Sequence, residues 1–120
     1  MDLDDAERFA AEWAAAWNSH DIERIMAHYR DDVTFVSPVA GWLLGNPVVQ
    51  GKEALRAYFS IGLEKLPNLR FDVTGVQFGI DTVVITYRNE RGQVVSEVLT
   101  FDGELVAHGR GTYGRDPANA

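Results

Sequence analysis

Glu97 stands where a charged side chain needs an explanation. It lies in the segment SEVLTFDG, residues 96–103, which reads as a β-strand that runs into an Asp-Gly turn. Side chains alternate between the two faces of a strand, so Glu97 shares a face with Val95, Leu99 and Phe101. A carboxylate on an apolar face loses its hydration and needs a compensating partner. A carboxyl group in such surroundings is a candidate general acid or base.

The hairpin that contains Glu97 offers it a partner. If Asp102-Gly103 is a two-residue turn, counting back along both strands places Glu97 directly opposite His108, with Arg110 as a diagonal neighbour. A three-residue turn would shift the pairing and separate these side chains. We predict that Glu97 and His108 form an acid–base pair in which the imidazole relays or holds the proton that the glutamate donates. A structural salt bridge of Glu97 with His108 or Arg110 is the alternative.

The elements that must position these residues follow from the apolar patterns. Helical spacing predicts three helices, at residues 4–17, 21–29 and 52–66. Alternation predicts a short strand at 32–37, and the Gly- and Pro-rich segment 39–51 is expected to be a loop. Four further strands are predicted, at residues 70–78, 82–89, 93–101 and 104–113. Helices followed by an antiparallel meander indicate an α+β fold.

Neither face of the last predicted hairpin is strongly polar. The side chains on the face opposite Glu97 include Val94, Val98 and Ala107. A sheet with water on one side shows a cleaner alternation of apolar and polar residues. We therefore expect helices over one face and a second subunit over the other, which gives a homodimer through the outer sheet face.

Composition and charge exclude several classes of function. The 120 residues predict one domain at 1–115 followed by a disordered tail at 116–120. A net charge of −7 without a Lys/Arg cluster argues against nucleic acid and against an anionic membrane as partners. The absence of cysteine excludes disulfides and thiol nucleophiles. The acidic first residues lack an apolar signal segment and no apolar run could span a bilayer, so a cytoplasmic location is the expectation.

Motifs for metal or nucleotide chemistry are missing from the sequence. It contains no Gly-rich phosphate cradle, no nucleophile elbow and no HExxH. His28 and Asp32 have the spacing of a helical metal pair, but the chain is predicted to turn into a strand there. We expect neither a metal ion nor an organic cofactor.

A resemblance to a known family covers nearly the whole chain. The run AEWAAAWNSHDIERIMAHYRDDVTFVSP, residues 11–38, resembles the opening of bacterial ketosteroid isomerases and of SnoaL-like polyketide cyclases, both in the nuclear transport factor 2 (NTF2)-like superfamily. The segments at 51–55, 57–59 and 96–102 match again. The resemblance implies a cystatin-like α+β cone, in which three N-terminal helices pack on a curved antiparallel sheet around an apolar pocket. It implies a fold more strongly than an activity.

The resemblance also implies roles for single residues. Ketosteroid isomerases use a carboxylate base, together with a tyrosine and a protonated aspartic acid that donate to the enolate oxygen. Glu97 fills the position of the acid, Trp13 that of the tyrosine and Ser37 that of the base. A serine hydroxyl without an activating base does not accept a proton at neutral pH, which argues against steroid isomerisation itself. The supporting tyrosines fall on Tyr29 and Phe59.

The sequence thus predicts a protein that binds a small, largely apolar ligand with one polar group. In one hypothesis it is a proton-transfer enzyme, an isomerase, dehydratase or cyclase, that uses Glu97 and His108. In the other it is a binding module that catalyses no reaction. The loop at 39–51 brings Trp42 to the pocket. The predicted pocket residues are Trp13, Trp17, Tyr29, Ser37, Trp42, Tyr58, Phe59, Leu99 and Arg110.

Overall fold

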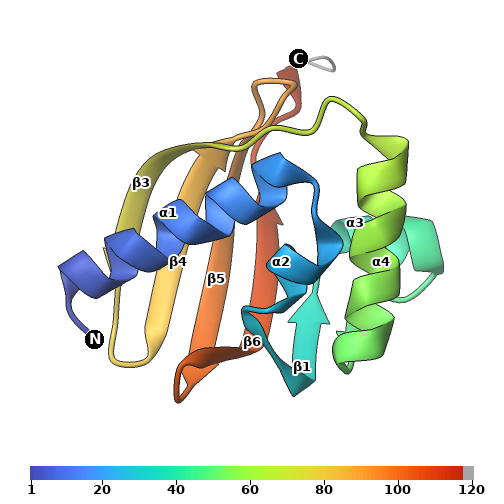
Figure 1. Ribbon diagram of the computed structural model, residues 1–120. Coiled ribbons are helices and arrows are strands. Elements are labelled where there is room, and N and C mark those ends of the chain that lie inside the picture. The colour runs from blue at the N-terminus through green and yellow to red at the C-terminus, as the bar shows by residue number, and fades with distance from the viewer. Residues whose placement is uncertain (118–120) are drawn as a thin grey trace.

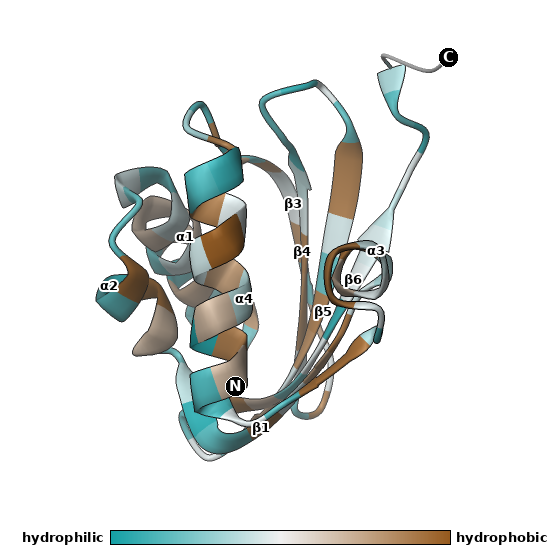
Figure 2. Ribbon diagram, turned by 90° about the vertical axis from the view of Figure 1, so that its right-hand side faces the viewer, coloured by the Kyte–Doolittle hydropathy of each residue, from teal (hydrophilic) through white to brown (hydrophobic). Residues whose placement is uncertain are grey.

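A curved sheet carries the fold, and helices α1, α2 and α4 lie on one side of it (Figures 1 and 2). The computed structural model describes residues 1–117. Its helices are α1 (Leu3–Ser19), α2 (Ile22–Met26), α3 (Pro38–Leu44) and α4 (Lys52–Lys65). Its strands are β1 (Tyr29–Val36), β2 (Val48–Gln50), β3 (Asp72–Phe78), β4 (Thr82–Arg88), β5 (Val94–Asp102) and β6 (Leu105–Tyr113). The predicted α+β class is confirmed.

The six strands form one sheet in the order β2-β1-β6-β5-β4-β3. All neighbours are antiparallel except β1 and β6, which run parallel. The predicted curved antiparallel sheet is confirmed at the other four pairings, and the β1–β6 pairing adds a parallel one. Turn signals in a sequence indicate which strands are joined by hairpins, and β1 and β6 are not joined in that way. The sheet remains open, because β2 and β3 form its two edges.

The segment predicted as a loop at 39–51 contains α3 and β2. Ser37 caps the start of α3, where its Oγ accepts a hydrogen bond from the backbone N–H of Val39 at 3.2 Å. Pro38 follows at the first helical position, and Gly45 ends the helix with φ +77°. Gly45, a glycine of the segment predicted as a loop, therefore caps the end of a short helix that begins at Pro38.

Helix α1 buries one apolar stripe. The Asp2 carboxylate accepts a hydrogen bond from the Asp5 N–H, and the Asp5 carboxylate accepts one from the Asp2 N–H, which completes a capping box. The stripe is buried, and its members are Ala6, Ala10, Trp13, Ala14 and Trp17. His20 ends the helix in the left-handed conformation, φ 60°. The end of α1 thereby brings Trp17 over the concave face of the sheet.

The register of the β5–β6 hairpin differs from the predicted one. Asp102 pairs with Leu105, so Gly103-Glu104 is the turn, and a register shift follows between Thr100 and Phe101. The bulge offsets the pairs farther from the turn by one more residue on β6. Glu97 therefore pairs with Gly111 and not with His108. His108 pairs with Thr100 and Arg110 with Val98, both on the other face of the sheet. The predicted contact of Glu97 with His108 or Arg110 is therefore wrong.

Gly109 on β6 lies against the ring of Phe35 on β1. A Cβ atom there would come within 2.8 Å of Phe35 Cδ1 and 3.1 Å of Cε1. We expect Gly109→Ala to lower the free energy of unfolding by about 1–3 kcal/mol, because overpacking forces the neighbouring ring to move. Urea denaturation measures the change. Gly111→Ala is the matched control, since its nearest contacts would be 3.4 Å away. Equal stability of the two variants would contradict this account.

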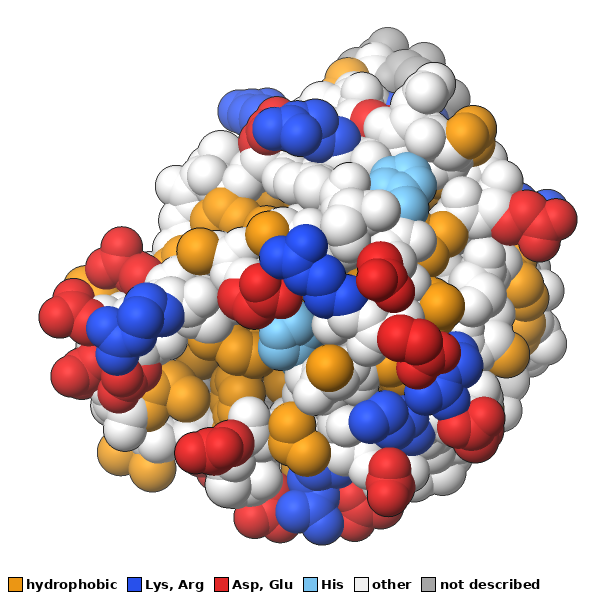
Figure 3. Space-filling view, viewed as in Figure 1, with side chains coloured by type: hydrophobic (Ala, Val, Ile, Leu, Met, Phe, Trp, Pro, Cys, Tyr) orange, Lys and Arg blue, Asp and Glu red, His pale blue; other side chains and the backbone are white. Residues whose placement is uncertain are grey.

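Charges of both signs are interspersed on the surface. The face seen in Figure 3 carries acidic and basic side chains side by side, without a basic patch. Several are in ion pairs, among them Arg24 with Glu12 at 2.8 Å and Arg56 with Glu23 at 3.0 Å. Within residues 1–117, no helix combines the length and the apolar character needed to cross a membrane.

Candidate functional site

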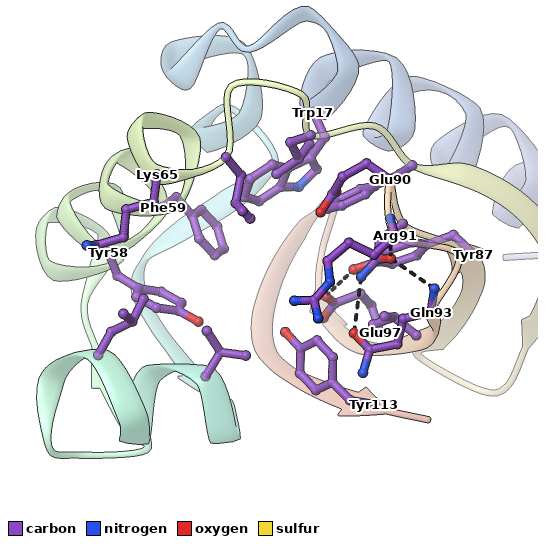
Figure 4. A pocket seen from close by; sticks show the side chains of 18 of the residues that line it. Trp17, Tyr58, Phe59, Lys65, Tyr87, Glu90, Arg91, Gln93, Glu97 and Tyr113 are labelled. Carbon is purple, nitrogen blue, oxygen red and sulfur yellow. Dashed lines mark hydrogen bonds between the residues drawn. The ribbon is translucent and has the colours of Figure 1, made fainter. Parts of the chain in front are cut away.

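A cavity of about 590 Å³ opens between α3, α4 and the inner face of the sheet (Figure 4). Its wall is largely aromatic, with side chains from α1, α4 and four strands. The aromatic lining consists of Trp17, Phe35, Trp42, Tyr58, Phe59, Phe71, Tyr87 and Tyr113. Polar side chains also line the cavity, among them Lys65 at the end of α4 and Gln93 beside the β4–β5 turn. Such a cavity suits a largely apolar small molecule.

Glu97 is the one acidic side chain buried in this wall among the described residues; it is 6% exposed. Tyr87 donates its O–H to Glu97 Oε1 at 3.2 Å, while Oε2 has no hydrogen-bond partner among residues 1–117. Burial raises the pKa of Glu97 to about 7, and the hydrogen bond from Tyr87 opposes that rise. A carboxyl group with this pKa can both take up and release a proton near neutral pH.

Three hydroxyl groups form a second polar cluster at the cavity, those of Ser37, Tyr58 and Tyr113. The two tyrosines line the cavity, and Ser37 is fully buried next to them. Burial raises the pKa of both tyrosines, the negative charge of Glu97 adds to this rise, and Ser37 opposes it. Figure 4 shows the two phenol oxygens pointing toward one another from α4 and β6. Gly111, which pairs with Glu97, leaves the space that the Tyr113 hydroxyl and Ser37 Oγ border.

Counting donors and acceptors shows what this cluster can offer a ligand. A serine hydroxyl has one proton and two lone pairs, and the N–H of Val39 already occupies one lone pair of Ser37. Tyr58 and Tyr113 line the cavity, and a phenol hydroxyl can donate its proton to another acceptor. The cavity therefore offers phenol donors and, at Glu97 Oε2, an acceptor without a partner among the described residues.

Three residues predicted for the pocket belong to the core behind it. Trp13 donates its indole N–H to the Tyr29 hydroxyl at 3.2 Å, and both are 1% exposed. Leu99 is fully buried on β5. Trp13 is thus not free to orient a ligand through its N–H, because the core uses that donor.

The other predicted site residues lie on both faces of the sheet. Trp17, Trp42, Tyr58, Phe59 and Glu97 line the cavity, and Ser37 lies beneath two of its tyrosines. His108 and Arg110 lie on the other face of the sheet. Sequence reasoning missed Tyr87 and Tyr113. Strand alternation could have placed Tyr87 on an inner face, but its contact with Glu97 depends on the β4–β5 register.

Two contacts join the β4–β5 turn to the chain that follows β6. Arg91 forms an ion pair with Asp116, and the Gln93 side chain donates to the backbone carbonyl of Gly114 at 2.9 Å. Of the tail predicted to be disordered at 116–120, residues 118–120 lie outside the described residues. In the described part of the chain, no group of three or more His, Asp or Glu side chains is arranged to hold a metal ion.

Comparison with protein families identifies the family of this chain. Residues 10–114 match the SnoaL-like domain. The chain belongs to the SnoaL-like family. A SnoaL-like protein of unknown function from Burkholderia thailandensis E264 has the same fold, with a TM-score of 0.91 and 32% sequence identity. The match covers 96% of this chain and 99% of that chain.

More distant structures share the SnoaL-like fold. One is a proposed isomerase of the SnoaL-like family from Agrobacterium tumefaciens C58. It has a TM-score of 0.76 at 18% identity, over 94% of this chain and 100% of that chain. A protein with a ketosteroid isomerase-like fold from Catenulispora acidiphila, in complex with trimethylamine, has a TM-score of 0.68 at 18% identity over 87% and 83%. A search of curated proteins returns no match. The predicted resemblance is confirmed for family and fold.

Proposed function

We propose that this SnoaL-like protein is a proton-transfer enzyme for a small, largely apolar carbonyl compound. The observation that carries the proposal is the Glu97 carboxyl group. It is buried in an aromatic cavity, Tyr87 binds one of its oxygens, and the other oxygen is unpaired among the described residues. Its pKa of about 7 lets it act as base and then as acid at neutral pH.

The reaction needs a second group that stabilises the charge on the carbonyl oxygen. Glu97 takes a proton from the carbon next to the carbonyl, and the electron pair of that C–H bond moves to form an enolate. The phenol O–H of Tyr58 or Tyr113, both in the cavity lining, donates to the enolate oxygen. The protonated Glu97 then returns the proton to another carbon, which completes an isomerisation with all atoms conserved. His108 has no part in this scheme, since it lies on the other face.

Proton exchange tests this proposal without knowledge of the natural substrate. A panel of cyclic enones and ketones in D₂O would be followed by NMR for loss of the α-proton signal. We expect exchange that speeds up as pH rises through about 7, because the Glu97 carboxylate is the base. Glu97→Gln should slow exchange by about 10²-fold or more. Glu64→Gln, an exposed glutamate on α4, should change nothing. Equal exchange rates in wild type and Glu97→Gln would contradict the proposal.

The position of Ser37 supports a second candidate, a binding module without turnover. The resemblance places the isomerase base there, and the buried Ser37 hydroxyl already accepts a hydrogen bond from the Val39 N–H. In this case Glu97 only binds the polar group of the ligand. Glu97→Gln would then change ligand affinity, and no member of the panel would exchange its proton at any pH.

A further inference from the structure

Besides Glu97 Oε2, two buried polar atoms of residues that line the cavity have no hydrogen-bond partner among the described residues. They are the indole Nε1 of Trp17 and the carboxylate oxygen Oε1 of Glu90, both shielded from water. Trp17 comes from the last turn of α1 and is 7% exposed, and Glu90 comes from the β4–β5 turn. Both residues line the cavity, and Figure 4 shows the Trp17 nitrogen on the ring edge that faces it.

The comparison of Trp17 with Trp13 shows that the unpaired N–H is unusual in this protein. The two rings lie 6.4 Å apart in the same cluster. The N–H of Trp13 donates to the Tyr29 hydroxyl, as a buried tryptophan usually does. An unpaired buried donor reduces stability, so a group that pairs with it gains affinity in return. The unpaired N–H of Trp17 therefore marks a place where a ligand can bind favourably.

This place is separated from Glu97 by aromatic rings. Phe71 lies 5.4 Å from Trp17 and 4.1 Å from Tyr87, measured between ring centroids. Tyr87 in turn donates to Glu97. A ligand that lies along this wall would have one end at Glu97, an apolar middle against Phe71 and Tyr87, and the other end at Trp17.

The chemistry of the two unpaired atoms limits what that far end can be. The indole N–H only donates, and an ionised carboxylate only accepts. A methyl group would leave both unpaired. A carboxylate would be repelled by Glu90, and an ammonium group would leave the N–H of Trp17 facing a cation. A hydroxyl group can accept from Trp17 and donate to Glu90.

We propose that Trp17 and Glu90 form a second polar subsite that binds a hydroxyl group at the end of the ligand remote from Glu97. The ligand class is then an apolar ring skeleton with a carbonyl or enol at one end and a hydroxyl at the other. This inference rests on the cavity of the proposed function, but it requires binding there and not turnover.

Two naphthols that differ by one group test the subsite by isothermal titration calorimetry. The probes are 2,6-dihydroxynaphthalene and 6-methyl-2-naphthol, whose shared phenol stands in for the enol at Glu97. We expect wild type to bind the diol about tenfold more tightly, as two added hydrogen bonds warrant. Trp17→Phe and, independently, Glu90→Met should each remove most of this preference while affinity for the methyl compound stays the same. Glu64→Met, at an exposed glutamate on α4 that does not line the cavity, is the matched control and should keep the preference.

The outcomes separate this inference from the proposed function. A diol preference that disappears in Trp17→Phe or Glu90→Met supports the subsite, even if no compound exchanges a proton. Equal affinity of wild type for the two naphthols overturns the subsite, as does a preference that both variants retain. Failure of both naphthols to bind also overturns it, because the ligand class would then be wrong. Proton exchange in the enone panel can still succeed in each of these cases.

Discussion

Glu97→Gln is expected to make the protein more stable than wild type at pH 8 by up to about 3 kcal/mol, and to have little effect below pH 4.5. The pKa of Glu97 rises from 4.5 to about 7 on folding because the carboxyl group is buried. That difference corresponds to about 3 kcal/mol of stability, since each pKa unit is worth about 1.4 kcal/mol. Glutamine keeps the shape of the side chain but carries no charge at any pH.

The direction of the pH dependence follows from proton binding. Between pH 4.5 and about 7 the folded protein binds more protons at Glu97 than the unfolded chain does, so wild-type stability falls as pH rises through this range. Above about pH 7 wild-type stability falls no further on account of Glu97, because its carboxyl group is then ionised in both the folded and the unfolded protein. Urea denaturation of both proteins at pH 4, 6 and 8 measures the difference, with Glu64→Gln as the control. Parallel stability curves for wild type and Glu97→Gln would show that Glu97 is not held with a raised pKa.

Trp13→Ala is expected to lower the free energy of unfolding by about 3–5 kcal/mol. Trp13 is 1% exposed, and its ring lies 5.6 Å from the rings of both Phe71 and Tyr87. Removing it leaves a large void behind the cavity wall and takes the donor from the Tyr29 hydroxyl. The variant tests whether Trp13 belongs to the core, as the structure places it, or to a ligand site.

Thermal or urea unfolding measures the effect, and Trp42→Ala provides the control. Trp42 is 79% exposed on α3, so its removal should change stability by about 0.5 kcal/mol or less. Similar losses in the two variants would contradict the assignment of Trp13 to the core. Loss of ligand binding in Trp13→Ala without loss of stability would instead assign Trp13 to the ligand site.

Local periodicity predicted most of the fold, because helices and strands bury apolar residues at fixed spacings. The helix predicted at 4–17 is α1, and the strand predicted at 82–89 is β4. The predicted strand that ends before Pro38 and the predicted loop at 39–51 miss the short helix α3, although a proline at the start and a glycine at the end are usual helix boundaries. Pairing between distant strands, as in β1–β6, has no local signal.

The candidate site was predicted only in part for the same reason. Alternation placed Glu97 on the inner face of β5 correctly. Its partner depended on register, and the bulge near the β5–β6 turn moved His108 to the other face and brought Gly111 opposite Glu97. Tyr87 reaches Glu97 from β4, a neighbour whose register no turn signal gave. The homodimer through the outer sheet face stays a prediction.

The parallel pairing of β1 with β6 has a consequence for the order of folding. Strands β3, β4 and β5 are joined by short turns and can pair early, whereas Phe35 must find Gly109 across most of the chain. Contacts that close such long loops form late and slow the folding rate. Ser37 follows β1 and Tyr113 ends β6, so the hydroxyl cluster is completed only in this last step. A ligand that needs the cluster would therefore bind only the fully paired chain and stabilise its last-formed part most directly.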